Sequence, residues 1–319
     1  MIGLIGKRVA ALAPVLLGIS LAAFLSLALC PGDAAKISLM AMTGSETPPA
    51  AAVEQVRAQM GLDRPLAVQY WRWLGRIARG DFGLSYQTGR PVVEEVGRAL
   101  VASAMLATAA MALTIALAAP AGILAALNNR GWWDRLCLAG CVAVGAVPNF
   151  FLAIVLILIL AIRFKLVPVA GYGTPGSLAL PALSLALINA AVSARLMRTS
   201  MLEALGQRFL TAARGRGLTE TMVIGRHALR SAAIPMVSYL GSQFGYLFGG
   251  AAVVETLFLW PGLGRLLVDA VRSRDVFVVQ GCVLAIAGAF VTINLAADLI
   301  HALIDPRVGQ AQTGRGPAG

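Results

Sequence analysis

The chain has 319 residues, of which 58% are hydrophobic and 13% are charged, with a formal net charge of +11 at pH 7. Soluble domains carry roughly 25% charged residues, so this composition excludes an ordinary soluble globule and indicates a polytopic membrane protein. The basic residues stand at the ends of apolar runs and do not form a stripe with interleaved aromatic residues. This distribution follows the positive-inside rule and argues against nucleic acid as a partner.

Charge-poor windows of about 20 residues predict six transmembrane helices. They lie within residues 9–30, 99–129, 136–162, 166–194, 231–254 and 276–297. The first window is too long for the apolar region of a signal peptide, so we interpret it as an uncleaved anchor. The predicted fold is therefore an all-α integral membrane protein, with one transmembrane domain over residues 1–319.

The placement of Lys and Arg predicts the orientation of these spans. With the N-terminus inside, the cytoplasmic segments hold 13 basic and 5 acidic residues, and the outer segments hold the other 13 basic and 10 acidic residues. Eight of the outer basic residues belong to the long segment 31–98, and long segments are translocated largely regardless of charge. We expect both termini in the cytoplasm of a bacterial plasma membrane protein, and a disordered tail over residues 308–319.

The segment 31–98 is the one soluble stretch of real size. Its pattern predicts helices over 50–60 and 66–78, separated by a Gly- and Pro-containing break. In the second helix, Tyr70, Trp71 and Trp73 are consistent with three roles: packing in the protein, capping a translocation path, or resting on the membrane surface.

The residues 195–235 form a basic, glycine-broken loop between two apolar spans. Seven arginines in this loop are opposed by only Glu203 and Glu220. We expect short helices here, with Thr219 as the N-cap of one of them and Met222 available to fill a groove on a partner. The predicted cytoplasmic position makes the loop a docking element. The alternative is an ordinary basic loop held by lipid phosphates.

Motifs for enzyme chemistry are missing from the sequence. There is no G-x-x-x-x-G-K-[ST] phosphate loop, so the chain is not expected to hydrolyse ATP, and no H-E-x-x-H or G-x-S-x-G occurs. Cys137 and Cys141 stand one helical turn apart, but without nearby histidines they are expected to pack as small apolar residues. No cofactor and no metal site are predicted. Asp298, near the end of the last span, leaves open a proton-coupled secondary carrier.

Several short motifs in chain order resemble those of one transporter family. In the loop the matching residues are Ala212-Ala213, Gly217-Leu218, Arg226-His227-Ala228-Leu229-Arg230 and Ile234-Pro235. Elsewhere they are Pro31-Gly32-Asp33, residues 60–65, Gln69-Tyr70, residues 80–85, Pro148-Asn149-Phe150, residues 168–172, residues 254–258, residues 260–265 and Asp305-Pro306-Arg307. Together they resemble the permease subunits of binding-protein-dependent ABC importers, in the peptide/nickel branch.

The resemblance implies a type I ABC importer permease fold with a periplasmic insertion after the first helix. It implies as partners a second homologous permease subunit, cytoplasmic ABC ATPase subunits and an extracytoplasmic substrate-binding protein, all in a lipid membrane. The implied ATPase-coupling residues are Glu203, Ala212, Ala213, Gly217, Leu218, Met222, His227 and Pro235. Candidates for the translocation path or gate are Pro148, Asn149, Glu255, Pro261 and Gly262.

The cargo is left open by the residues. The spans offer no cluster of His, Cys or carboxylates able to hold a bare transition metal, which would favour imidazole or thiolate ligands. We therefore expect di- or oligopeptides, or else nickel enclosed in a chelating molecule. Gln207 and Arg208 are more typical of nickel-type members.

Overall fold

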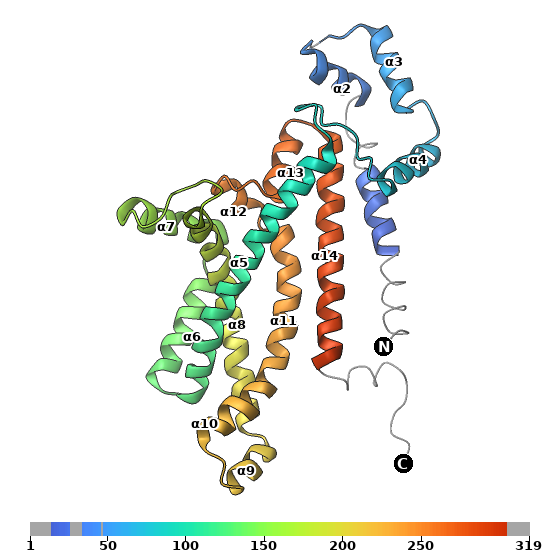
Figure 1. Ribbon diagram of the computed structural model, residues 1–319. Coiled ribbons are helices and arrows are strands. Elements are labelled where there is room, and N and C mark those ends of the chain that lie inside the picture. The colour runs from blue at the N-terminus through green and yellow to red at the C-terminus, as the bar shows by residue number, and fades with distance from the viewer. Residues whose placement is uncertain (1–13, 26–33, 46, 305–319) are drawn as a thin grey trace, which may run out of the picture. The chain divides into compact units, whose positions relative to one another are not determined.

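The computed structural model describes residues 14–25, 34–45 and 47–304, and these residues are almost entirely helical (Figure 1). Within them there is no β-strand, and one isolated antiparallel bridge joins Leu84 and Pro91. The predicted all-α fold is confirmed. The chain divides into two compact units, one of Met1–Ser103 with Pro261–Val291 and the other of Ala104–Trp260 with Thr292–Gly319. The predicted tail over 308–319 lies outside the described residues.

Three described helices are long and apolar enough to cross a membrane. They are α5 (Val92–Leu127), α8 (Pro175–Leu205) and the part Val276–Ala297 of α14 (Val276–Ile304). A shorter apolar helix, Pro14–Leu25, covers part of the first predicted span, whose remainder lies outside the described residues. The fifth predicted span corresponds to α11 (Leu229–Gly250), which at 22 residues reaches about 33 Å but is not one of these three helices.

The third predicted span is not one straight helix. The helix α6 (Trp132–Gly145) is followed by α7 (Asn149–Leu156) and the π-helix η1 (Ile157–Arg163), and the two halves are bent by 105°. Pro148 is the N-cap of α7. Proline has no N–H to donate and disfavours the helical conformation in the residue before it, so α6 ends and a new helix starts. The predicted third span, within residues 136–162, is therefore broken at Pro148.

In the first unit, the helices α2 (Ala34–Thr43), α3 (Ala50–Met60) and α4 (Leu66–Ala78) lie within the segment 31–98 that was predicted to be extracytoplasmic. The bounds of α3 and α4 agree with the predicted helices. Trp73 of α4 is buried and donates its indole N–H to Oε1 of Gln280 at 3.0 Å. The amide of Gln280 donates in turn to the Ala23 carbonyl at 3.2 Å. For Trp73, the packing role is therefore confirmed.

A second polar junction in this unit fixes the start of α14. The hydroxyl of Ser85 donates to Oδ2 of Asp275 at 2.7 Å, and Oδ1 of Asp275 accepts the backbone N–H of Val278 at 3.3 Å. Asp275 therefore caps α14 and ties it to the turn before α5. The helix α13 (Leu263–Arg272) completes the unit.

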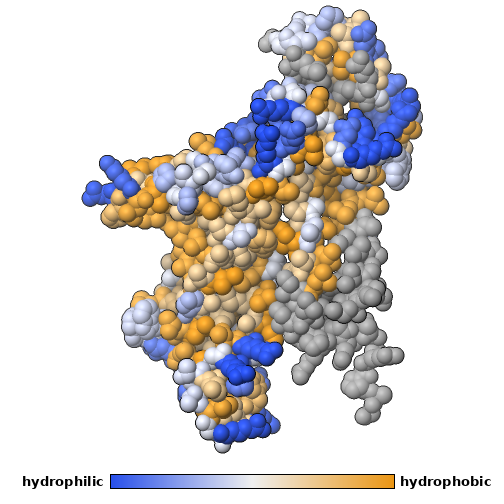
Figure 2. Space-filling model, viewed as in Figure 1, coloured by the Kyte–Doolittle hydropathy of each residue, from blue (hydrophilic) through white to orange (hydrophobic). Residues whose placement is uncertain are grey.

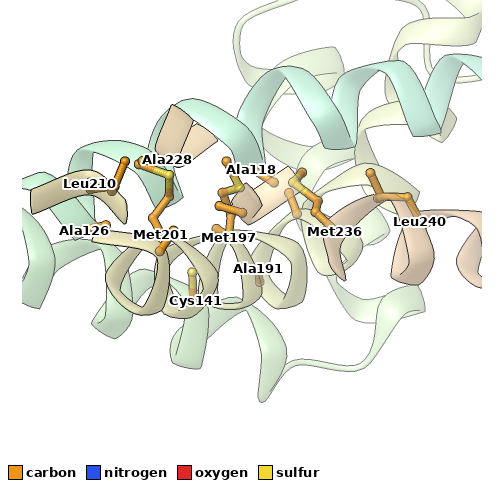
Figure 3. Packing of buried hydrophobic residues seen from close by; sticks show 14 of the residues in the cluster. Ala118, Ala126, Cys141, Ala191, Met197, Met201, Leu210, Ala228, Met236 and Leu240 are labelled. Carbon is orange, nitrogen blue, oxygen red and sulfur yellow. The ribbon is translucent and has the colours of Figure 1, made fainter. Parts of the chain in front are cut away.

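The second unit packs α5, α6, α8 and α11 through small side chains. A Cβ added to Gly122 of α5 would lie 2.6 Å from the Ala194 carbonyl oxygen of α8, so the two backbones are in close contact. Membrane helices associate by such close packing, because lipid supplies no hydrophobic driving force between them. Figure 3 shows the core around Met197 and Met201 of α8, with alanines of α5 beside them.

Candidate functional site

The predicted docking loop folds into a compact series of short helices at the junction of α8 and α11. After α8 come α9 (Arg208–Gly215), α10 (Glu220–Met222) and the π-helix η2 (Val223–Ala228). Thr219 is the N-cap of α10 as predicted, but its side chain makes no capping hydrogen bond. Its carbonyl accepts the N–H groups of Met222 and Val223, each at 2.9 Å. In Figure 1 this end of the unit carries the labels α9 and α10.

Gly217 closes α9 with a left-handed turn. Its φ is +80°, its N–H donates to Arg214 at 2.9 Å, and the next N–H, of Leu218, donates to Ala213 at 3.4 Å. These two bonds are the Schellman pattern that ends many helices, and glycine adopts the required conformation without steric cost. A Cβ at Gly217 would meet no atom within 4 Å. The position therefore needs glycine for its backbone conformation.

The inner face of the loop is part of the core of the second unit. Leu210, Val223 and Ala228 are fully buried and belong to one cluster with Met201, which Figure 3 shows for Leu210, Ala228 and Met201. Ala213 belongs to the same cluster, so within this chain it faces the protein's own core. The loop is thus a folded extension of α8 and α11.

The outer face of the loop carries apolar side chains among charged ones. Phe209 is 47% exposed and Met222 is 45% exposed, and Ala212 is exposed as well. Figure 2 shows hydrophilic residues gathered at this end of the unit, with apolar atoms between them. Met222 was expected here from the sequence, but Phe209 was not. Its signal was an aromatic residue just after the N-cap of an expected helix in an otherwise polar loop.

An ion pair joins the two arms of the loop. Nε of Arg214 donates to Oε1 of Glu220 at 2.6 Å, which links α9 to the start of α10. The hydrogen bond from Arg214 lowers the pKa of the Glu220 carboxyl, and the same bond raises the pKa of the Arg214 guanidinium. Both groups are therefore charged at neutral pH, which keeps the outer face strongly polar around Phe209 and Met222.

The other predicted coupling residues occupy the edges of the loop. Glu203 is exposed in the last turn of α8, and Pro235 is exposed near the start of α11. His227 is half-buried in η2, and Leu218 is half-buried against the core cluster. All eight predicted residues belong to the stretch from the end of α8 to the start of α11, with Ala213 on the inner side.

A buried ion pair stands beside the loop. Arg198 of α8 binds both carboxylate oxygens of Asp134 at the start of α6, and its Nη2 lies 2.7 Å from Oδ2. Oδ2 also accepts the backbone N–H of Arg130 at 2.9 Å, in the turn where Arg130 itself has φ +63°. The Asp134 side chain is 3% exposed. This fork ties the turn between α5 and α6 to α8, about two turns before α8 ends at Leu205. The sequence placed both residues in cytoplasmic segments but did not pair them.

The candidate pathway residues divide between the two units. Pro148 and Asn149 begin α7, which packs against α12 (Ala252–Leu257), the helix that holds the fully buried Glu255. Oδ1 of Asn149 is buried and makes no hydrogen bond in the described structure. Pro261 and Gly262 belong to the first unit, where Gly262 is the N-cap of α13.

Comparison with known proteins agrees with this architecture and places the chain in a family. The family profile described as "Binding-protein-dependent transport system inner membrane component" matches residues 118–310, and a profile for the N-terminal part of such membrane components matches residues 1–107. The chain belongs to this family. It is a permease subunit of an ABC importer in the peptide/nickel branch, and the resemblance stated from the motifs is confirmed.

Individual relatives are similar over nearly their full length. The chain is 38% identical over 308 residues to the glutathione transport system permease protein GsiC of Escherichia coli K12, which covers 97% of this chain and 99% of that protein. GsiC of Shigella boydii serotype 4 is 37% identical over the same coverage. Among solved structures, an inward-facing MetNI methionine ABC transporter matches 66% of this chain and 96% of its own, with a TM-score of 0.53 and 16% identity. That likeness confirms the ABC importer permease fold.

Proposed function

We propose that this permease forms half of a translocation pathway for glutathione or other short peptides. The observation that supports this cargo is the 38% identity to GsiC, a glutathione transport system permease, over 97% of the chain. Nearly every segment that can line a path has its counterpart in that relative. Of the two cargoes left open by the residues, a short peptide is therefore the one we favour over chelated nickel.

The second part of the proposal concerns coupling to ATP hydrolysis. The outer face of the loop, with Phe209, Ala212 and Met222, docks on a cytoplasmic ATPase subunit. Exposure of its apolar side chains to water is unfavourable, and the charged side chains around them form a polar rim like that of protein interfaces. Because the inner face is packed into the core of α8 and α11, movement of the ATPase displaces those helices with it.

The proposed assembly contains four kinds of chain. A second permease subunit completes the pathway, ATPase subunits bind the loop from the cytoplasm, and a substrate-binding protein delivers cargo at the other side. Residues 31–98 are the extracytoplasmic segment, and residues 195–235 are the coupling loop. Both termini lie in the cytoplasm.

Uptake in a strain that lacks this gene tests the cargo. Labelled glutathione, di- to pentapeptides, free nickel and chelated nickel are supplied separately, with the gene restored on a plasmid as control. We expect uptake of glutathione or short peptides to disappear and to return with the plasmid. Loss of chelated nickel uptake alone would replace the peptide cargo with the chelate, and loss of free nickel uptake alone would contradict both.

Paired substitutions test the docking face. Burying a large apolar side chain contributes about 1.5–3 kcal/mol, so each of Phe209→Ala and Met222→Ala is expected to weaken ATPase binding about tenfold or more. Leu84→Ala is the matched control, since Leu84 is 54% exposed in the other unit. Retention of the ATPase by the purified permease is the measurement. Equal retention by all three variants would show that the ATPase binds elsewhere.

A further inference from the structure

The helix α4 has a structural role on one side and an unexplained surface on the other. Its inner face packs against the helix Pro14–Leu25 and against α14, both of which are apolar helices of the first unit. The residues of this contact are Tyr70, Trp73, Leu74 and Ile77 of α4 with Ala23, Phe24, Val283 and Leu284. These contacts fix where α4 lies along two helices that enter the membrane.

The depth of α4 follows from its contacts on α14. The apolar span of α14 begins at Val276, and Trp73 hydrogen-bonds Gln280, which is one turn further on. At 1.5 Å per residue, Gln280 and Leu284 lie about 6 and 12 Å into the span. The contacts of α4 therefore fall on the first turns of the apolar span, so α4 packs beside the end of a helix that can cross the membrane.

The outer face of α4 exposes large apolar side chains at this depth. Val68 is 39% and Trp71 64% exposed. Trp73, two residues later and on the opposite side of the helix, is buried, whereas Trp71 is exposed. Exposed tryptophan and aliphatic residues are typical of helices that lie in the membrane interface, where the ring meets the headgroup region.

Arginines flank these apolar side chains. With 3.6 residues per turn, Arg72 and Arg76 fall on one flank of α4 next to Val68, and Arg79 follows as the C-cap of the helix. Together with Arg64 they line a cavity of about 670 Å³ whose lining includes a single acidic residue, Asp63. Among the described residues no carboxylate lies within ion-pair distance of these four guanidinium groups. Figure 2 shows the hydrophilic patch over α4.

We propose that α4 is an interfacial helix that binds the phosphate groups of anionic phospholipids, in the leaflet at the N-terminal end of α14. Val68 and Trp71 enter the acyl boundary, and the arginines hold the phosphates. A guanidinium presents a planar fork of donors that matches phosphate oxygens, and it is more weakly hydrated than an ammonium group. An acidic protein surface carries the same negative charge as these lipids. The apolar side chains at this depth face lipid, however, which favours the membrane as the partner.

Lipid retention in nanodiscs tests the proposal on the full chain. The wild-type chain and two double variants are reconstituted in phosphatidylcholine with 0, 10 or 30 mol% phosphatidylglycerol, and lipids that stay bound are counted after extraction into detergent. R72Q/R76Q removes two arginines of the cavity, and R90Q/R98Q removes two exposed arginines outside it. An arginine near an anionic surface strengthens binding to that surface about fivefold. We therefore expect the phosphatidylglycerol preference of R72Q/R76Q to fall about fivefold for each arginine removed. The control R90Q/R98Q is expected to keep that preference.

Fluorescence of the wild-type chain supplies an independent measurement. The contribution of Trp71 is the difference between the wild type and Trp71→Phe, and phospholipids brominated on their acyl chains are expected to quench it. Quenching by aqueous iodide without quenching by bromolipids would place Trp71 in water and overturn the proposal. Equal loss of phosphatidylglycerol in both double variants would overturn it too. A third outcome would also overturn it: the wild type shows no preference for phosphatidylglycerol, and R72Q/R76Q releases an acidic binding protein.

Discussion

At the scale of single residues, Asp134 and Arg198 form a buried ion pair between two helices. The Asp134 side chain is 3% exposed and that of Arg198 is 19% exposed, and the two residues are 64 positions apart in the sequence. A buried pair of this kind adds little net stability over apolar residues, yet removing one partner leaves the other charge without compensation. The pair therefore fixes how the α5–α6 turn meets α8, next to the loop.

Replacing Asp134 with Ala is expected to lower the free energy of unfolding by about 2–3 kcal/mol. Breaking a fully buried pair costs about 3–5 kcal/mol, and the partial exposure of Arg198 reduces that loss. The control is Glu94→Ala, since Glu94 pairs with Arg98 on the surface, with side chains 53% and 69% exposed. An exposed pair contributes up to about 1 kcal/mol. Thermal unfolding in detergent measures both, and similar losses in the two variants would contradict the distinction.

At the scale of elements, the sequence predicted the helices whose ends carry local signals. The bounds of α3 and α4 were predictable because Pro49, Gly61 and Pro65 mark them in the sequence. Pro148 predicts a kink between α6 and α7, but the size of the bend was not predictable, because the window is apolar throughout. The two faces of the coupling loop were also beyond prediction. Which side of α9 is buried depends on Met201 and Val223, residues outside that helix.

The turn after α9 gives the element its own test. At Gly217, with φ +80°, a Cβ costs about 1–2 kcal/mol, so Gly217→Ala is expected to destabilise the loop by that amount and to weaken coupling. Gly215→Ala is the control, because Gly215 is in the last turn of α9 with open space around it, and alanine there is expected to gain up to about 1 kcal/mol. Unfolding and substrate-stimulated ATP hydrolysis are measured in the assembled complex. Equal behaviour of the two variants would show that Gly217 does not keep this conformation there.

At the scale of the whole molecule, the orientation predicted from charge assigns the loop to the cytoplasm and residues 31–98 to the outside. A chain with its native cysteines replaced, carrying a single cysteine at Gln87 or Gln207, tests this. Both side chains are exposed, whereas Ser85 nearby is buried against Asp275. A membrane-impermeant maleimide is expected to label position 87 in intact cells and position 207 only after permeabilisation. Labelling of position 207 from outside would place the loop where no ATPase can reach it.

The energy source of transport is the last property that belongs to the whole assembly. A permease driven by ATPase subunits needs no titratable group in its spans, whereas a proton-coupled carrier normally keeps a carboxylate there, at a cost of about 2.5–3.5 kcal/mol on insertion scales. The sequence candidate for that group is Asp298, whose side chain lies outside the described residues, and Glu255, although buried, belongs to the short helix α12. We therefore expect Asp298→Asn to keep most of the uptake activity. In cells that express the complete system, uptake should stop when ATP is depleted and continue when the proton gradient is dissipated with ATP maintained. Uptake that follows the proton gradient and is lost in Asp298→Asn would instead assign the chain to a secondary carrier, because the coupling would then reside in the permease itself.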